Sequence, residues 1–222
     1  MRYIYNFKQL LNENKTADKI NNFLSDSKLE GKIKKIKVSD LTPAQNEIFL
    51  DEIVSNLLEK KKFVKKSLKG KLKDEEILVS SDNYIIDGHH KWASAFILNP
   101  DCKIKCTKIN LPLKETIKIL KDLLEEINAG NQRQSGNFKY NIFDMVKSEK
   151  DDLKKSIVNI FKNKSGNEKK LLKKIRKKSK SELHPLNLLI RHIYKLPTPD
   201  KKSYDREDMS QMSDKEIDEI LN

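Results

Sequence analysis

The chain has 222 residues, of which 36% are hydrophobic and 36% are charged, and its formal net charge of +13 favours an anionic partner. This length suffices for one well-packed core with a smaller appendage. No apolar run approaches the roughly 20 residues that span a bilayer, the N-terminus lacks the apolar core of a signal peptide, and two cysteines do not make a disulfide framework. The composition therefore predicts a cytoplasmic protein without a membrane partner.

Four segments precede the best-defined part of the chain. Residues 1–31 carry apolar positions that suit two short helices, and residues 32–38 alternate as a strand. Thr42 and the proline after it then offer an N-cap and a first helical position, which predicts a helix over residues 43–60. The basic, loosely patterned stretch over residues 60–73 is predicted as a connector.

A hairpin followed at once by a helix is the clearest pattern in the sequence. Residues 77–80 and 84–86 are rich in β-forming residues and flank a polar turn. Apolar and small residues then recur at helical spacing up to Leu98. Trp92 lies on the apolar face of this helix, and we expect it to be buried against the hairpin.

The second half of the chain is predicted to be mostly helical. A strand over residues 103–111 and a helix after Pro112 come before a polar, glycine-containing segment, residues 129–141, which predicts a linker. Apolar residues at helical spacing continue beyond the linker and include helices predicted at residues 185–193 and 214–221.

The turn between the hairpin and the helix carries groups that suit an anion. Gly88 allows a close approach of the backbone, and the first N–H groups of a helix attract negative charge. His89, His90 and Lys91 add donors around the same point. This chemistry predicts a phosphate site, with simple helix capping and exposed histidines as the alternative.

The same residues carry a resemblance to a known fold. Residues 87–91, followed by an aromatic and small residues, resemble the signature motif of the ParB/sulfiredoxin fold, and residues 36–45 are similar to its first strand and the turn after it. The resemblance covers residues 32–128. It implies an α+β domain with a small mixed sheet and flanking helices, a fold on which members carry out several chemistries.

Within this fold, the motif is most similar to that of the nucleotide-dependent free-serine kinases. The resemblance implies that the Gly-His-His turn holds nucleotide phosphates and that the aspartate helps to position the reactive groups. ATP or another nucleotide, with Mg²⁺, would be the cofactor. The residues that match are Asp87, Gly88, His89, His90 and Lys91.

A carboxylate on the first helix of these kinases acts as the base toward the substrate hydroxyl. Glu47 matches this residue by placement, and Asp51 and Glu52 are the alternatives. The resemblance thus implies a catalytic set of Glu47, Asp87 and His90, in which a carboxylate takes a proton while cationic groups stabilise the phosphate oxygens.

Other members of the fold fit less well. Sulfiredoxins carry Gly-Cys-His-Arg in the motif, and His89 replaces the cysteine whose thiolate they need. Chromosome-partition ParB proteins carry Gly-Glu-Arg-Arg, which grips CTP, whereas His89 and His90 replace the glutamate and the first arginine. A zinc site from the histidines with Cys102 and Cys106 is disfavoured by their spacing, and the cysteines are predicted as small core residues.

A second candidate surface lies near the C-terminus. Between Lys162 and Lys180 stand ten Lys or Arg residues against a single acid, Glu168. The block lacks the aromatic residues on which single-stranded nucleic acids stack, so it predicts phosphate-backbone binding or a solvated helical face. The residues that we assign to nucleic acid are Lys169, Lys170, Lys173, Lys174, Arg176, Lys177 and Lys178.

The sequence therefore predicts a helical lead (residues 1–31), a ParB/sulfiredoxin-like domain (32–128), a linker (129–141) and a basic helical C-terminal region (142–222). The predicted function is nucleotide binding with phosphoryl transfer or triphosphate hydrolysis. The alternatives are a DNA- or RNA-binding ParB-like protein and a ParB-like nuclease.

Two observations would separate these functions, and the oligomeric state stays open. A groove sized for one nucleotide, with Glu47 facing His90, would favour the enzyme. A basic track that joins Lys91 to residues 162–180 would favour nucleic acid.

Overall fold

The computed structural model of the protein describes residues 29–126, 140–147, 150–164 and 166–205. The two helices predicted within residues 1–31, most of the predicted linker and the helix predicted at residues 214–221 lie outside the described residues.

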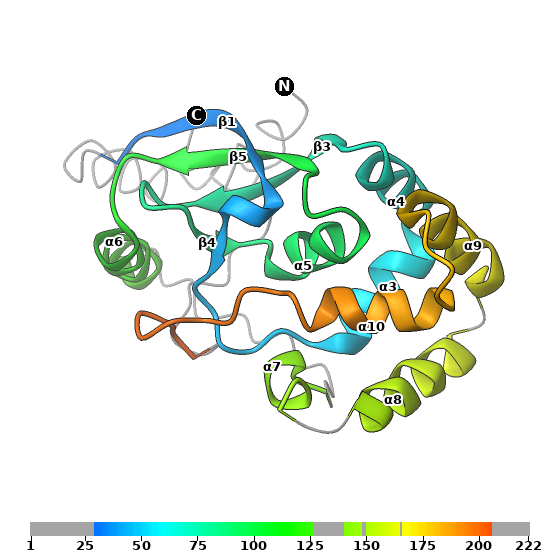
Figure 1. The fold of residues 1–222 in the computed structure, drawn as a ribbon. Helices are drawn as coiled ribbons and strands as arrows, with labels where there is room; N and C mark the ends of the chain where they lie inside the picture. Colours follow the sequence, from blue (N-terminus) through cyan, green and yellow to red (C-terminus); the bar gives the residue numbers. More distant parts are fainter. Residues whose placement is uncertain (1–28, 127–139, 148–149, 165, 206–222) are drawn as a thin grey trace, which may run out of the picture.

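A mixed five-stranded sheet organises the first half of the described chain (Figure 1). Its order is β1-β5-β3-β4-β2, with β1–β5 and β3–β4 antiparallel and β5–β3 and β4–β2 parallel. The predicted α+β class with a small mixed sheet is therefore confirmed. The bounds are β1 (Gly31–Lys37), β2 (Thr42–Pro43), β3 (Lys71–Val79), β4 (Tyr84–Asp87) and β5 (Lys103–Ile109).

Helices cover both faces of this sheet. Successive strand residues point to opposite faces, so that Ile77 of β3 joins one hydrophobic cluster and Leu78 joins the other. The cluster around Leu78 packs against α6, and the cluster around Ile77 packs against α5 and the remaining helices. The helices are α3 (Leu50–Glu59), α4 (Lys61–Leu68), α5 (His89–Leu98), α6 (Leu113–Glu126), α7 (Ile142–Met145), α8 (Lys150–Asn163), α9 (Glu168–Ser179) and α10 (Pro185–Ile193), with a short 3-10 turn η1 (Val38–Asp40).

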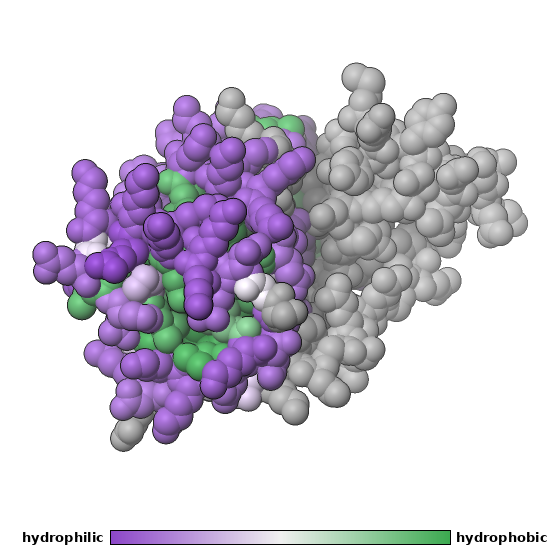
Figure 2. Space-filling view, turned by 90° about the vertical axis from the view of Figure 1, so that its right-hand side faces the viewer, coloured by the Kyte–Doolittle hydropathy of each residue, from purple (hydrophilic) through white to green (hydrophobic). Residues whose placement is uncertain are grey.

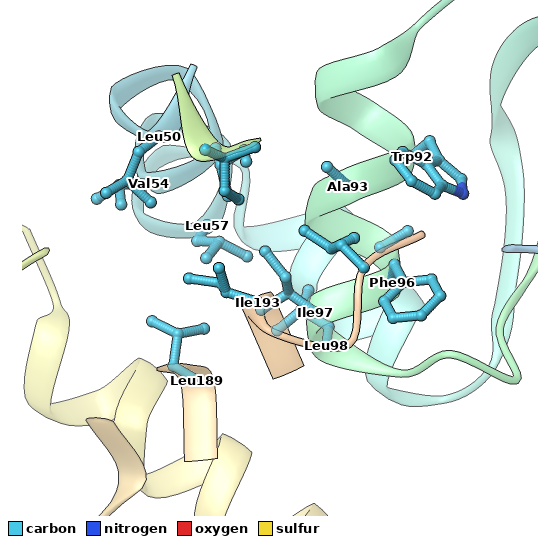
Figure 3. Packing of buried hydrophobic residues seen from close by; sticks show 14 of the residues in the cluster. Leu50, Val54, Leu57, Trp92, Ala93, Phe96, Ile97, Leu98, Leu189 and Ile193 are labelled. Carbon is cyan, nitrogen blue, oxygen red and sulfur yellow. The ribbon is translucent and has the colours of Figure 1, made fainter. Parts of the chain in front are cut away.

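The helices after residue 141 share the core of the first half rather than building their own. Side chains of α3, α5 and α10 meet in one cluster (Figure 3), and the buried residues of α8 and α9 belong to the same cluster. The described parts of the predicted C-terminal region are thus packed onto the predicted domain of residues 32–128. Figure 3 shows the residues that carry this contact, which include Leu57, Ile97, Leu189 and Ile193.

The helix predicted over residues 43–60 is wrong in its first half. Thr42 and Pro43 form the short strand β2, which pairs with Tyr84 and Ile85 of β4, and α3 begins only at Leu50. The local N-cap signal was overridden because the sheet edge offers Thr42 hydrogen-bond partners that a helix start cannot.

The connector predicted over residues 60–73 is also wrong, because it contains α4. The buried Phe63 and Val64 anchor this helix to the core, and its Lys61, Lys62 and Lys65 are exposed. A lysine-rich segment with so few apolar positions gives a weak helical pattern, although the amphipathic spacing is present.

Trp92 is fully buried, as predicted, and its indole N–H donates to the carbonyl oxygen of Val38 at 2.8 Å. Its ring lies 5.9 Å from that of Phe96. Cys102 and Cys106 are buried in the same core, as expected for small core residues, and burial raises the pKa of Cys102 to about 11. Among the described helices, none is long and apolar enough to cross a bilayer.

We expect Trp92→Ala to lower the free energy of unfolding by about 3–5 kcal/mol, since it leaves a large cavity and removes the partner of the Val38 carbonyl. Trp92→Phe should lose less, because most of the volume is kept. Urea unfolding followed by circular dichroism measures both values. A loss below about 1 kcal/mol for Trp92→Ala would contradict the placement of α5 in the core.

Candidate functional site

The glycine at the start of α5 is explained by packing within the protein. Gly88 is the N-cap residue and has a φ of +89°, which side-chain-bearing residues rarely adopt. A Cβ added there would lie 2.5 Å from the Cγ2 atom of Ile77 in β3. The turn between β4 and α5 is therefore pressed against the sheet, and this contact alone requires glycine.

Both histidines of the motif bind the protein's own backbone. The Nε2 atom of His89 accepts from the N–H of Gln45 at 3.2 Å, and the Nε2 atom of His90 accepts from the N–H of Phe49 at 2.9 Å. Because a backbone N–H can only donate, both Nε2 atoms must be unprotonated. His89 is 4% exposed, so its ring is enclosed as well as hydrogen-bonded.

The other nitrogen of His90 is also engaged. Its Nδ1 atom lies 2.8 Å from a carboxylate oxygen of Glu52, so Nδ1 carries the proton and donates to Glu52. The imidazole ring is stacked on the ring of Phe49, with 6.2 Å between the two ring centres. His90 thus has neither a proton nor a lone pair left for a ligand while these two contacts persist.

The segment that the histidines hold, residues 45–49, is also fixed from its outer side. The N–H of Ile48 donates to the side-chain oxygen of Asn141. The N–H of Leu50, the first residue of α3, donates to the carbonyl oxygen of Tyr140. The N–H of Tyr204 donates to the carbonyl oxygen of Ala44, and the carbonyl oxygen of Tyr204 accepts from the N–H of Asn46. The start of α5 is consequently covered by a segment whose amide groups are largely satisfied.

The C-terminal arm, residues 197–205, is pinned to the sheet nearby. The Tyr84 hydroxyl donates to the Asp200 carboxylate, and the ammonium of Lys202 lies 5.2 Å from the centre of the Tyr84 ring. The hydrogen bond to Asp200 raises the pKa of Tyr84 to about 12 and, in return, lowers the pKa of Asp200. This arm forms one wall of a cleft.

Glu47 lines that cleft, which has a volume of about 430 Å³. The motif residues 88–91 are not among the residues that line this cleft. The carboxylate beside His90 is instead Glu52, one of the two alternatives predicted. The lining residues are Asn46, Glu47, Asn141, Phe143, Asp144, Lys147, Thr198, Pro199, Ser203 and Asp205.

The remaining predicted site residues lie around the start of α5. Asp87 and Lys91 are half-buried, and both interact with other groups of the protein. Asp51, the other alternative base, lies on α3 with one buried oxygen that has no hydrogen-bond partner among the described residues. In the part of the chain that the structure describes, no three His, Cys, Asp or Glu side chains are grouped as metal ligands would be.

A second surface of interest is formed by the exposed sides of α4 and α9, which we name the basic face (Figure 2). The cations that α9 contributes are all exposed, and none forms an ion pair with a residue that the structure describes. Figure 2 shows hydrophilic residues around a small apolar area on this side of the molecule. The basic face comprises Lys61, Lys62, Lys65 and Lys69 with Lys169, Lys170, Lys173, Lys174, Arg176, Lys177 and Lys178.

A small groove joins the two helices of the basic face. Its apolar walls are Leu57, Leu58, Val64 and Leu171, and its volume is about 120 Å³. Lysines of both helices stand at its rims, which places the charges of α4 and α9 on one continuous surface. Those lysines are Lys61, Lys170 and Lys174.

Sequence analysis missed the contribution of α4 to this surface. The sequence pattern predicts a connector over residues 60–73, so the lysines of this segment are absent from the predicted nucleic-acid-binding residues. The signal was present in the buried pair Phe63 and Val64, which leaves the flanking lysines on the opposite side of a helix. Lys91 does not line the groove, so the groove does not provide the basic track from Lys91 to residues 162–180 that would favour nucleic acid.

Comparisons with protein-family models, with curated proteins and with solved structures give no match for this chain. The resemblance of residues 32–128 to the ParB/sulfiredoxin fold therefore stays a prediction.

We expect His90→Ala to lower the free energy of unfolding by about 1–3 kcal/mol, because the N–H of Phe49 and the carboxylate of Glu52 each lose a hydrogen bond to the imidazole. Amide exchange of Phe49 should accelerate at the same time. Lys118→Ala, an exposed change on α6, is the control and should alter neither quantity. Wild-type stability and unchanged protection of Phe49 in His90→Ala would show that the ring does not hold residues 45–49.

Proposed function

We propose that the protein binds the phosphate backbone of nucleic acid through the basic face. The observation that carries this proposal is the set of seven exposed cations on α9 without ion pairs to described residues, beside the lysines of α4. A surface of one sign that is this dense attracts polyanions over several ångströms and gains from the release of their counterions.

The arrangement of α9 costs stability when no anion is bound. Lys169 and Lys173, like Lys170 and Lys174, are four residues apart on one helix, where like charges repel. The three cations of the last turn interact favourably with the helix dipole, but those of the first two turns do not. A bound polyanion would remove this repulsion, which supports a binding role for the surface.

The contacts of the motif support the same choice. A phosphate at the start of α5 would compete with residues 45–49, whose backbone already occupies the imidazoles of His89 and His90. The basic face requires no such rearrangement, because its charged groups already point to solvent. Nucleic-acid binding, the alternative in our sequence analysis, is therefore preferred to phosphoryl transfer.

Nucleotide binding is a second candidate because the cleft beside Glu47 has the size of a small-molecule site. Its charges are unfavourable for free phosphates because, among the described residues that line it, three carboxylates (Glu47, Asp144 and Asp205) outnumber the single cation, Lys147. A nucleotide would need Mg²⁺ between its phosphates and these carboxylates. We keep the ParB/sulfiredoxin-like kinase or NTPase as a proposal for this cleft only.

Calorimetric titration with ATP, ADP and CTP, with and without Mg²⁺, tests the second candidate. If the cleft holds a nucleotide, binding should require Mg²⁺ and should weaken at least tenfold in Lys147→Gln, which removes the cation that faces the phosphates. Lys118→Gln, an exposed change on α6, serves as the control outside the cleft. The candidate falls if no nucleotide binds under either condition.

For the basic face, we expect the triple variant Lys170→Gln, Lys173→Gln and Lys174→Gln to lose affinity for a 24-base-pair duplex. Each lost phosphate contact lowers the slope of log K against log salt by about 0.9, so three contacts lower it by about 2.7. Fluorescence anisotropy between 50 and 200 mM salt, about the range over which such slopes are measured, gives both values.

A variant with the same loss of charge elsewhere is the matched control: Lys114→Gln, Lys118→Gln and Lys201→Gln, all exposed and outside the basic face. It should keep most of the affinity and the slope of the wild type. Equal losses in the two triple variants would show that net charge alone, and not this surface, attracts the duplex. Absence of binding by the wild type would overturn the proposal.

A further inference from the structure

Strand register places three lysines in a row at one end of the sheet. Lys37 of β1 lies directly opposite Lys103 of β5, and Lys103 lies directly opposite Lys71 of β3. Residues that face each other across neighbouring strands point to the same side of a sheet. With about 4.8 Å between strands, the row spans about 10 Å. We name Lys37, Lys103 and Lys71 the lysine row.

The row is exposed, and within the described residues its one ion pair is weak. Leu72 and Ile104, the next residues along their strands, are buried under α5, so the lysines point to the opposite side of the sheet. Asp101 lies 3.7 Å from Lys37, but this aspartate is 82% exposed and contributes little. Like charges directly opposite each other on adjacent strands destabilise a sheet.

The lysine row begins directly after α4, but it lies on the side of the sheet that faces away from α5. Lys69 caps the C-terminus of α4, Gly70 makes the turn, and Lys71 begins β3. The carbonyl of Gly70 accepts from the N–H of Lys103, which ties the row to the end of α4. Figure 1 shows α9, α4 and the start of β3 along one side of the molecule. The cations thus follow one another from α9 over α4 and around the end of the sheet to its opposite side.

The side chains along this path suit a duplex better than a single strand. Single strands are held by stacking of their bases on exposed aromatic side chains. Phe63, the aromatic residue of α4, is buried, and α9 and the lysine row have none. Cationic side chains without aromatic neighbours can contact the phosphates but cannot stack on the bases. A duplex presents phosphates at twice the axial density of one strand, so it suits this surface better.

We infer that the partner is a nucleic-acid duplex held along a track that runs from α9 over α4 to the lysine row. This inference rests on the proposed function of the basic face and adds both the class of nucleic acid and a second set of contacts. With 12 residues, α9 extends about 18 Å, and the row adds about 10 Å of sheet. Recognition by phosphate contacts alone is independent of base sequence.

The test compares three probes of about 24 nucleotides per strand: a DNA duplex, an RNA duplex and single-stranded oligo-dT, by fluorescence anisotropy across a salt series. The variant Lys71→Gln/Lys103→Gln should lower the slope for a DNA duplex by about 1.8, at 0.9 for each contact. The control Lys114→Gln/Lys118→Gln should leave it unchanged. Because the row variant removes repulsion, it should unfold at the same or a higher urea concentration than the wild type.

The results distinguish failure of the track from failure of nucleic-acid binding by the basic face. Duplex binding that α9 substitutions weaken, but that the row variant leaves at the control value, would overturn the track while the basic face stands. Oligo-dT binding as tight as that of either duplex would overturn the duplex assignment. No binding of any probe, or retention on vesicles of anionic lipid alone, would overturn the proposed function and with it the track. The two duplex probes show whether DNA or RNA is preferred.

Discussion

Two hydrogen bonds from backbone N–H groups to imidazole nitrogens hold this fold together at its centre. Through them, His89 and His90 fix residues 45–49 across the start of α5. The position of α3 follows, because this helix begins directly after Phe49 and its Glu52 accepts from the other nitrogen of His90. The neutral imidazole suits this task, since it presents one acceptor and one donor on opposite sides of a rigid ring.

The placement of α3 in turn determines the basic face. Its apolar side packs on α5 and α10 (Figure 3), and its Leu57 and Leu58 line the groove where α4 and α9 meet. Because Leu171, Leu172 and Ile175 of α9 are buried, the cations on the opposite side of this helix are exposed to solvent. A polyanion-binding surface is therefore a consequence of how the core is shared between the two halves of the chain.

Sequence patterns predicted those elements whose signals are local. The hairpin and α5 were predicted because β-forming runs, a polar turn and a helical apolar spacing follow one another within residues 77–98. The start of α10 was likewise given by Pro185, and the preceding His184 accepts from the N–H of Leu186 as its cap. The burial of Trp92 followed from its position on the apolar face.

The site was harder to predict because its contacts are distant in sequence. The partners of His89 and His90 lie 44 and 41 residues away, and no local pattern shows that they are backbone groups rather than a phosphate. Thr42 and Pro43 have the residue types of a helix start, but they pair with β4 as a short strand instead. The lysine row depends on strand register, which a single sequence specifies only through the hydrophobic alternation of each strand.

The central claim is that the turn at residues 88–91 holds the fold while the basic face binds the ligand. Two-dimensional ¹H–¹⁵N NMR during titration with a DNA duplex at low salt tests both halves at once. We predict that amide signals of α9, of α4 and near Lys71 and Lys103 shift, while those of residues 45–49 and 88–91 stay in place. Shifts concentrated at residues 45–49 and 88–91, with α9 unaffected, would contradict the account.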